Sequence, residues 1–378
     1  MRQKVVWFIL GVLVGGLFVV SAYPSNGNIQ YVAPAVQKIP GNNYTTLLLY
    51  SPNGLSLNVK NVQKAVQQFV VKNALKAKWH AYAVPELPSD AVLSGYGIKV
   101  TKDGRVNVLI LATRKGAFIQ PTEVQNELME WSKTAPKFMP DVIPRERIGV
   151  PEGWKAKSVD SNGNVRAYTG ESSPYWHNFG RLELRYDDPP YGKLYAQFYI
   201  WGLWNDGNPT EERFLCTTDE NGHGTYRVTP GVEIGGNYGN YFTNDIKITH
   251  DWGVDPTLNG RLGIMKPVGI INKYETLTIS IGPISYPLAI GGYKVYGDAI
   301  DPQAVWDFDI PYNEDTSHHT IGFMPSSEGV VKESVLHDGS WHSVINVKLW
   351  AKFRHKTIIG IIDSHESWAA VTWIVKVG

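Results

Sequence analysis

Apolar and charged residues alternate between Arg181 and Asp187, which is the pattern of a strand with one buried face. Leu182 and Leu184 lie on one face of this strand, whereas Arg181, Glu183 and Arg185 lie on the other. Further β-rich runs follow, separated by turn signals, and no long helical period interrupts them. They cover 193–203, 213–217, 224–229, 245–249, 274–281, 292–296, 305–310, 341–353, 357–363 and 368–377.

These runs predict an all-β domain over residues 168–378. Ten or more strands in a segment of this length are typical of a β-sandwich, and we expect one of jelly-roll type. A closed barrel is the alternative arrangement of the same strands.

Strand and helix signals alternate in the preceding segment, residues 31–134. Residues 45–50 predict a short strand, 58–76 an amphipathic helix and 79–84 a second strand. Lys102-Asp103-Gly104 lies between β-rich residues 97–101 and 106–112 and predicts a hairpin.

A second helix is expected from about Thr122, which has the spacing of a capping box with Gln125. A last strand over 138–143 would extend this unit to residue 143. The order of elements predicts a small α+β domain of the ferredoxin-like βαββαβ type.

Four prolines, at positions 136, 140, 144 and 151, interrupt the chain between the two segments. Because proline ends helices and central strands, we interpret residues 135–160 as a semi-rigid linker. A small unit ahead of such a linker has the layout of an inhibitory pro-domain, which favours an enzyme made as a zymogen.

The first 22 residues predict export. Arg2 and Lys4 precede an apolar run that ends in Val20-Ser21-Ala22, the small-residue exit of a secretory signal peptide. The alternative is an uncleaved anchor that tethers the chain to a membrane through residues 5–22. In either case we expect a secreted or extracytoplasmic membrane-anchored protein.

Charge and cysteine content narrow the choice of partners. The chain has 36 Lys and Arg and 35 Asp and Glu, and loss of the leader would remove Arg2 and Lys4. Because the net charge is near zero and the sequence contains no dense basic block, we do not expect nucleic acid as a partner. The single cysteine, Cys216, forms no internal disulfide and is expected to be a small buried residue.

Aromatic residues supply the first candidate site. Tyr195, Tyr199 and Trp201 fall on one face of a predicted strand, with Gln197 among them. Flat rings interleaved with an amide can stack on sugar rings, and further rings follow in the sequence at Tyr238, Tyr241 and Trp252. This pattern predicts binding of a polysaccharide or of neighbouring surface proteins. Alternatively, another part of the chain covers this face.

Carboxylates supply the second candidate. Asp307 and Asp309 fall on one face of a strand, and Glu314 follows. Such residues are typical of a glycosidase or carboxylate-type peptidase, so a secreted hydrolase with these three as catalytic residues is the alternative function. The same oxygens near Asp307 and Asp309 suit Ca²⁺, and a solvated strand edge is the third interpretation. The histidines show no zinc-binding spacing.

Three short motifs resemble two known families. The sequence Asn-Gly-His-Gly-Thr at 221–225 resembles the histidine motif of subtilisin-like proteases, and Ile-Ile-Asp-Ser at 361–364 their aspartate motif. Their order is reversed and a nucleophile segment is absent from the sequence, so we interpret the first motif as a turn. Residues 336–344 are similar to a stretch of laminin-G sandwiches, a resemblance that implies a turn leading into a core strand.

Overall fold

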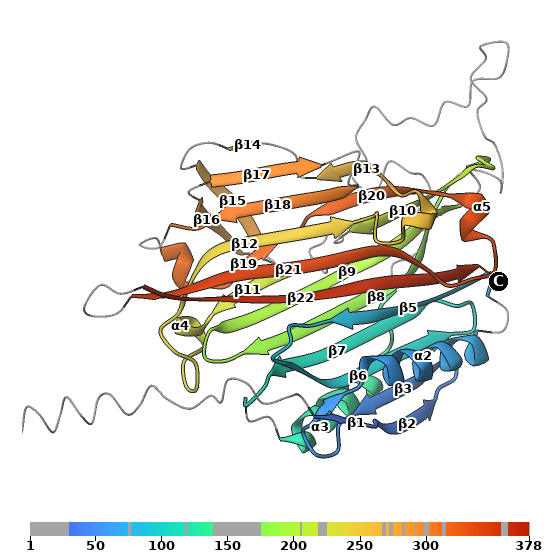
Figure 1. The fold of residues 1–378 in the computed structure, drawn as a ribbon, viewed down its shortest axis with the longest axis horizontal. Coiled ribbons are helices and arrows are strands. Elements are labelled where there is room, and N and C mark those ends of the chain that lie inside the picture. The colour runs from blue at the N-terminus through green and yellow to red at the C-terminus, as the bar shows by residue number, and fades with distance from the viewer. Residues whose placement is uncertain are drawn as a thin grey trace, which may run out of the picture.

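The computed structural model describes residues 30–74, 77–117, 120–138, 175–204, 206–217, 225–266, 270–271, 275–281, 284–290, 292–297, 302–311, 315–356 and 362–377. Within these residues the protein is mostly β, with two large sheets and few helices (Figure 1). The predicted leader lies outside the described residues. None of the described helices is both long and apolar enough to span a bilayer.

The larger of the two sheets, here called the large sheet, contains eleven of the described strands. Its main path runs in the order β13 (Arg261–Lys266), β20 (Ser326–Lys332), β10 (Glu211–Thr217), β9 (Gly192–Trp204), β8 (Tyr175–Asp188), β7 (Val106–Arg114), β6 (Ala91–Thr101), β3 (Tyr44–Tyr50) and β2 (Ala35–Pro40). Off this path, β11 (Tyr226–Pro230) pairs with β9 and with β19 (Ile321–Phe323).

The second sheet, here called the small sheet, lies over one face of the large sheet (Figure 1). Its order is β14 (Ile270–Ile271), β17 (Gly292–Gly297), β18 (Gln303–Asp309), β12 (Phe242–Asp251), β21 (His342–Lys356), β22 (Ile362–Val377) and β5 (Trp79–Glu86). Two further pairs are β1 (Tyr31–Val32) with β4 (Ser56–Leu57), and β15 (Glu275–Ile281) with β16 (Ile284–Ile290).

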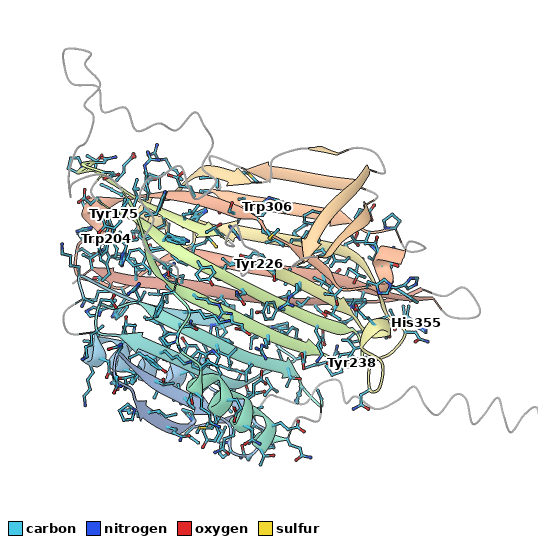
Figure 2. All side chains as sticks on the ribbon, turned by 180° about the vertical axis from the view of Figure 1, so that it is seen from behind. Tyr175, Trp204, Tyr226, Tyr238, Trp306 and His355 are labelled. Atoms are coloured by element: carbon cyan, nitrogen blue, oxygen red, sulfur yellow. The ribbon has the colours of Figure 1, made fainter. Side chains whose placement is uncertain are left out.

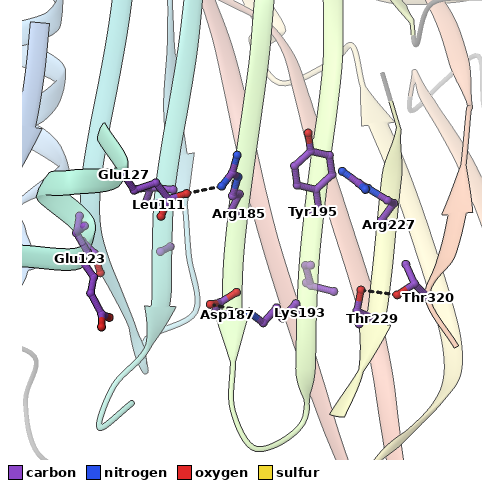
Figure 3. A pocket seen from close by; sticks show the side chains of 14 residues that line it. Leu111, Glu123, Glu127, Arg185, Asp187, Lys193, Tyr195, Arg227, Thr229 and Thr320 are labelled. Carbon is purple, nitrogen blue, oxygen red and sulfur yellow. Dashed lines mark hydrogen bonds and ion pairs between the residues drawn. The ribbon is translucent and has the colours of Figure 1, made fainter. Parts of the chain in front are cut away.

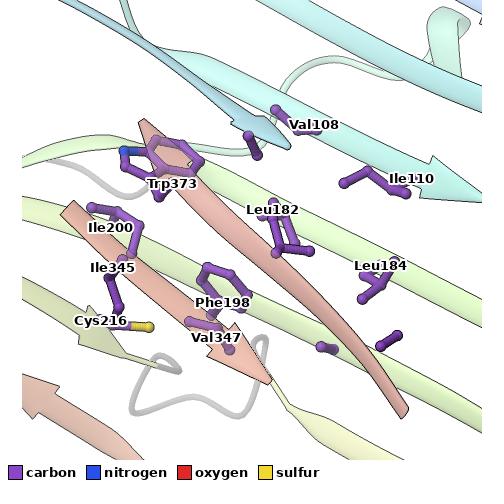
Figure 4. Packing of buried hydrophobic residues seen from close by; sticks show 14 of the residues in the cluster. Val108, Ile110, Leu182, Leu184, Phe198, Ile200, Cys216, Ile345, Val347 and Trp373 are labelled. Atoms are coloured by element: carbon purple, nitrogen blue, oxygen red, sulfur yellow. The ribbon is translucent and has the colours of Figure 1, made fainter. Parts of the chain in front are cut away.

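One hydrophobic core joins the two sheets (Figure 4). Leu182 and Leu184 of β8 point into it, as the alternation along that strand predicts, and Trp373 of the small sheet belongs to the same core. Cys216 is also buried in this core, which confirms its predicted role as a small buried residue. Burial raises the pKa of its thiol well above the usual value, so it is not a reactive nucleophile.

The helix α2 (Val59–Asn73) confirms the first helix predicted from the sequence. Asn58 caps it by accepting a hydrogen bond from the Asn61 N–H at 3.2 Å. Val62, Val66 and Phe69 are buried in the core on its apolar face. This helix therefore continues the layer formed by the small sheet beyond β5.

The second helix, α3 (Pro121–Lys133), packs on the other side of the large sheet. Its Val124 and Leu128 contact Leu109 and Leu111, which form a cluster separate from the main core. The predicted capping box is wrong, because Gln120 is the N-cap residue and Thr122 already lies inside the helix. The described residues contain four further short elements. Two are α-helices, α4 (Gly231–Ile234) and α5 (Glu333–Leu336), and two are 3₁₀ turns, η2 (Pro256–Leu258) and η3 (Asp315–His318).

The expected ferredoxin-like unit is not present in the described residues. In that fold both helices lie on one face of a single sheet, whereas α2 and α3 lie on opposite faces of the large sheet. In addition, β5 belongs to the small sheet. The last strand expected for this unit, at 138–143, falls almost entirely outside the described residues.

The two predicted segments share both sheets. Strand β7 pairs in parallel with β8, from Val106–Gly180 to Thr113–Asp187, and β5 pairs antiparallel with β22. Strand β6 is buried along its whole length, as expected for a central strand rather than one in a small separate domain. Removal of residues 31–143 would strip strands from both sheets, which argues against a removable pro-domain.

The strand order also differs from that of a jelly roll. Strands β8, β9 and β10 are consecutive in the chain and adjacent in the large sheet. A jelly roll instead sends most consecutive strands to opposite sheets through its two Greek keys. The expectation of two packed sheets is therefore confirmed, but the order in which the chain connects their strands is not that of a jelly roll.

Candidate functional site

The large sheet turns one face to the small sheet, and we call the opposite face the outer face. Figure 2 shows the molecule from that side, with Tyr175 and Trp204 near one end and Tyr238 near the other. A groove of about 580 Å³ lies on the outer face beside α3. It is lined by Ser94, Leu111, Ala112, Glu123, Val124, Glu127, Arg185, Asp187, Lys193, Leu194, Tyr195, Arg227, Thr229 and Thr320.

Strand alternation and register place the polar residues of this groove. Along β8 the charged residues that alternate with the core leucines all point to the outer face. The register sets Arg185 opposite Tyr195 of β9, and Tyr195 opposite Arg227 of β11. Three neighbouring strands therefore present these side chains in one row (Figure 3).

An ion-pair network forms the wall of the groove nearest to α3. The Arg185 Nε donates to Glu183 Oε1 at 2.8 Å, and the same guanidinium also bonds to Glu127 of α3. Arg181 donates to Glu183 at 3.1 Å and to Gln197 Oε1 at 2.5 Å. Burial raises the pKa of Glu127, and the Arg185 charge opposes this rise. The network joins α3 to the sheet.

Tyr195 and Arg227 form the opposite wall. The Arg227 guanidinium lies 4.0 Å above the centre of the Tyr195 ring, and Figure 3 shows it pointing toward that ring. The Tyr195 hydroxyl donates to Gln197 Oε1 at 2.6 Å. Burial raises the pKa of Tyr195. One face of the aromatic ring is thus occupied by a guanidinium and is closed to a sugar ring.

Arg227 differs from the other two cations of the groove. Arg185 pairs with carboxylates, and Lys193 Nζ lies 3.2 Å from Asp187 Oδ2. No described carboxylate forms an ion pair with Arg227, and its Nε is buried without a hydrogen-bond partner. Next to it, the Thr229 and Thr320 hydroxyls lie 2.9 Å apart. The Thr320 hydroxyl also donates to Glu233 Oε2 at 2.8 Å, so Thr229 donates to Thr320. The groove therefore offers a cation beside two hydroxyl oxygens that can still accept hydrogen bonds.

The predicted row of stacking rings does not form an open platform. Tyr199 and Trp201 are each 2% exposed, and they pack with Trp176, Leu203 and Leu215 in a buried cluster. Trp252 is fully buried and donates its indole N–H to Ser327 Oγ at 2.9 Å. Coverage of this face, the alternative interpretation of the sequence, applies to Tyr199 and Trp201, whereas Trp252 belongs to the main core.

The remaining two predicted aromatic residues lie toward the α4 end of the molecule. The Tyr238 ring is 5.4 Å from Lys193 Nζ, which places it close to the groove. Tyr241 is half-buried, and its hydroxyl donates to Asp363 Oδ2 at 2.7 Å. Of the six predicted ligand-binding residues, the structure brings Tyr195 into the groove and Tyr238 near it.

The predicted carboxylate pair lies on the small sheet and is not arranged for hydrolysis. Asp307 Oδ2 lies 3.2 Å from Lys247 Nζ, so its charge is neutralised. Asp309 is exposed and sits opposite Asp245 in the sheet register. Glu314 lies outside the described residues. Among described groups, neither aspartate belongs to a cluster of three metal-ligating side chains, so the Ca²⁺ expectation gains no support.

The three sequence motifs have different outcomes. Residues 362–364 of the aspartate motif lie at the start of β22. Residues 221–224 of the histidine motif lie outside the described residues. In the motif at 336–344, the His342 ring lies between Asp338 at 3.0 Å and Asp255 at 3.1 Å. Gly339 has a positive φ of 82°, as a tight turn requires, and Trp341 packs edge-on against Tyr82. This motif is a structural turn that leads into β21.

Sequence reasoning missed Arg227 and Glu127. The signal for Arg227 was present, because it alternates with Tyr226 and Val228 in a predicted strand and therefore faces away from the core. The contribution of Glu127 depends on where α3 docks, and helix periodicity alone does not specify that position.

Comparison with known proteins places the chain in no family. No protein-family model and no curated protein matches the sequence. Among solved structures, the chain is similar to "Streptococcus agalactiae AgI/II polypeptide BspA C terminal domain (WT)", at 8% identity and a TM-score of 0.17. The match covers 77% of this chain but only 58% of that structure. A TM-score this low establishes neither a shared fold nor a shared function.

Proposed function

We propose that this protein is an exported, surface-located binding protein whose outer-face groove holds a polysaccharide that carries acidic groups. The observation that supports the proposal is the pair formed by Arg227 and Tyr195. The Arg227 guanidinium lies over the Tyr195 ring, and both residues line the groove. The predicted leader supports the surface location. Binding of a neighbouring surface protein is the alternative use of the same groove.

The lining holds three carboxylates and three cations, so the preference for an acidic ligand rests on Arg227 and Tyr195. Neutral sugars bind well to open aromatic faces, but Arg227 covers one face of Tyr195 and the neighbouring rings Tyr199 and Trp201 are buried. A guanidinium instead binds a carboxylate through paired, charge-assisted hydrogen bonds. The adjacent Thr229 and Thr320 hydroxyls can hydrogen-bond sugar hydroxyls.

The size of the groove suits a ligand of this kind. A volume of about 580 Å³ lies within the range of small-ligand sites, enough for a few sugar residues of a longer chain. The formal charge of the protein is only +1, so long-range steering contributes little. Recognition would then depend on local contacts, and moderate salt should weaken it.

The described residues favour binding over hydrolysis. Asp307 is held by Lys247, and the carboxylate of Glu127 is engaged by Arg185. A general acid or nucleophile needs a carboxylate that is free to exchange a proton or attack. No specific observation supports the hydrolase, so we do not propose it.

The proposal can be tested by measuring retention of the purified full chain on uronate-containing polysaccharides and on matched neutral ones. Arg227→Gln should weaken binding of the acidic polymer about 10- to 100-fold, because a hydrogen bond to a charged group contributes roughly 1.5–3 kcal/mol. Arg261→Gln is the matched control, since that arginine is exposed on β13 and far from the groove lining.

Three results would count against the proposal. One is the absence of retention of the wild-type protein on every polysaccharide. Another is equal retention of wild type and Arg227→Gln on the acidic polymer. Saturable binding to a purified surface protein that Arg227→Gln abolishes, without any polysaccharide binding, would assign the groove to the alternative partner.

A further inference from the structure

A second cluster of polar side chains lies away from the groove, where α5 follows β20 at the end of the large sheet (Figure 1). Glu333 and His337 come from the α5 turn, and Glu212 comes from β10. Each offers one ligand atom, and these three atoms all lie within 4.8 Å of one another. The His337 Nε2 is 3.2 Å from Glu212 Oε1.

We propose that Glu212, Glu333 and His337 bind a Zn²⁺ ion, with a fourth position left open to water or another ligand. Zinc takes both carboxylate oxygens and imidazole nitrogens as ligands, and its open sites have three protein ligands. Ca²⁺ prefers six to eight oxygen ligands and fits this set poorly. Ligand atoms around zinc lie about 3.3 Å apart, from Zn–N and Zn–O bonds near 2 Å, so small side-chain rotations would complete the site.

An independent observation at the same place also points to a cation. The Oε2 atom of Glu333 is buried and has no hydrogen-bond partner. A carboxylate oxygen that is removed from water without a donor is costly, and such atoms call for an explanation. A bound cation would satisfy this oxygen.

The charges around Glu212 lead to the same conclusion. Its side chain is only 17% exposed. The carboxylates of Asp206 and Glu333 act on it electrostatically, so negative charge gathers at this place and a bound cation would offset it.

The surrounding structure holds the ligands in place. The Glu333 N–H donates to the Thr210 carbonyl at 3.0 Å, which ties α5 to the loop before β10. The His337 N–H donates to the Glu333 carbonyl at 3.0 Å, and the two side chains lie four residues apart on one turn. The His337 ring also packs edge-on against Trp79, with ring centres 5.7 Å apart. His337 remains 38% exposed, which gives an ion a route in.

The experiment is a calorimetric titration of the chelator-treated full chain with Zn²⁺ at pH 7, compared with Ca²⁺. Wild type should bind about one Zn²⁺ per chain and should bind it more tightly than Ca²⁺. His337→Gln and Glu333→Gln should each weaken binding at least tenfold, whereas His337→Cys, which keeps a zinc ligand, should retain it.

Exposed residues elsewhere provide matched controls, namely His319→Gln and Glu130→Gln, and far-UV circular dichroism confirms that each variant is folded. Absence of zinc binding by folded wild type would overturn the proposal. Unchanged zinc binding in His337→Gln and Glu333→Gln would also overturn it, as would Ca²⁺ binding in preference to Zn²⁺. None of these outcomes bears on the groove.

Discussion

Asp188 provides a sharp test of whether the two segments of the chain form one structural unit. This residue is 1% exposed at the end of β8. Its carboxylate is 3.3 Å from an Arg114 nitrogen on β7 and 2.9 Å from His365 Nε2 on β22, and it also accepts from the Ser367 hydroxyl. One buried carboxylate thus joins strands of both sheets and of both segments.

The expected cost of Asp188→Ala follows from this burial. Removal of one partner of a buried ion pair typically destabilises a protein by about 3–5 kcal/mol, because the other charge is left without compensation. Arg114 keeps a second partner, Asp90, at 3.3 Å, and the side chains of Arg114 and His365 keep 17% and 21% of their surfaces exposed. Both side chains therefore stay partly compensated. We therefore expect the lower end of the range, about 3 kcal/mol.

Urea unfolding followed by tryptophan fluorescence measures this loss. The control is Glu130→Ala, because its pair with Lys133 is exposed and should contribute under about 0.5 kcal/mol. Hydrogen exchange should show that residues 106–114 and 362–377 lose protection together in Asp188→Ala. A loss below about 1 kcal/mol, or faster exchange in only one of the two strands, would show that Asp188 does not hold the two segments together.

Three further changes test other parts of the structure. Trp201→Ala should cost about 3–5 kcal/mol in chemical denaturation yet leave ligand retention by the folded protein unchanged, because Trp201 is buried outside the groove. Gly329→Ala should lower the melting temperature by several degrees in calorimetry, since the added carbon would lie 2.1 Å from the Trp252 ring. Burial alone would lower the pKa of His342. The carboxylates of Asp338 and Asp255 act in the opposite direction and more strongly, so the pKa of His342 is raised. His342 should therefore stabilise the fold below pH 6.5 and lose this effect as pH rises through its folded-state pKa, a dependence that His342→Gln should remove from urea midpoints.

The sequence predicted the local elements well because their patterns are local. The alternation in β8 and the buried face of α2 both follow from side-chain periodicity. The parallel pairing of β7 with β8 does not follow from side-chain periodicity, because it joins strands on either side of a long connection and no nearby residue specifies the partner. For that reason the sequence did not indicate that the two segments pair in one sheet.

The candidate site shows the same limit at the level of single residues. Alternation correctly placed Tyr195, Tyr199 and Trp201 on one face of β9. It could not distinguish an open face from a covered one. Asp307 is a second example, because Lys247 of the neighbouring strand β12 pairs with it. That neighbour follows only from the order of strands in the sheet, which the sequence pattern does not give.

The cross-strand neighbours explain why one face of β9 has two different characters. Tyr195 has arginines on both sides in the register, Arg185 and Arg227, and so belongs to a charged surface that must stay in contact with water or a polar ligand. Trp201 instead has Asn178 and Leu215 beside it and joins an apolar cluster. Because cross-strand pairs determine the chemistry of a sheet face, the binding properties of β9 follow from β8, β10 and β11 as much as from its own aromatic residues.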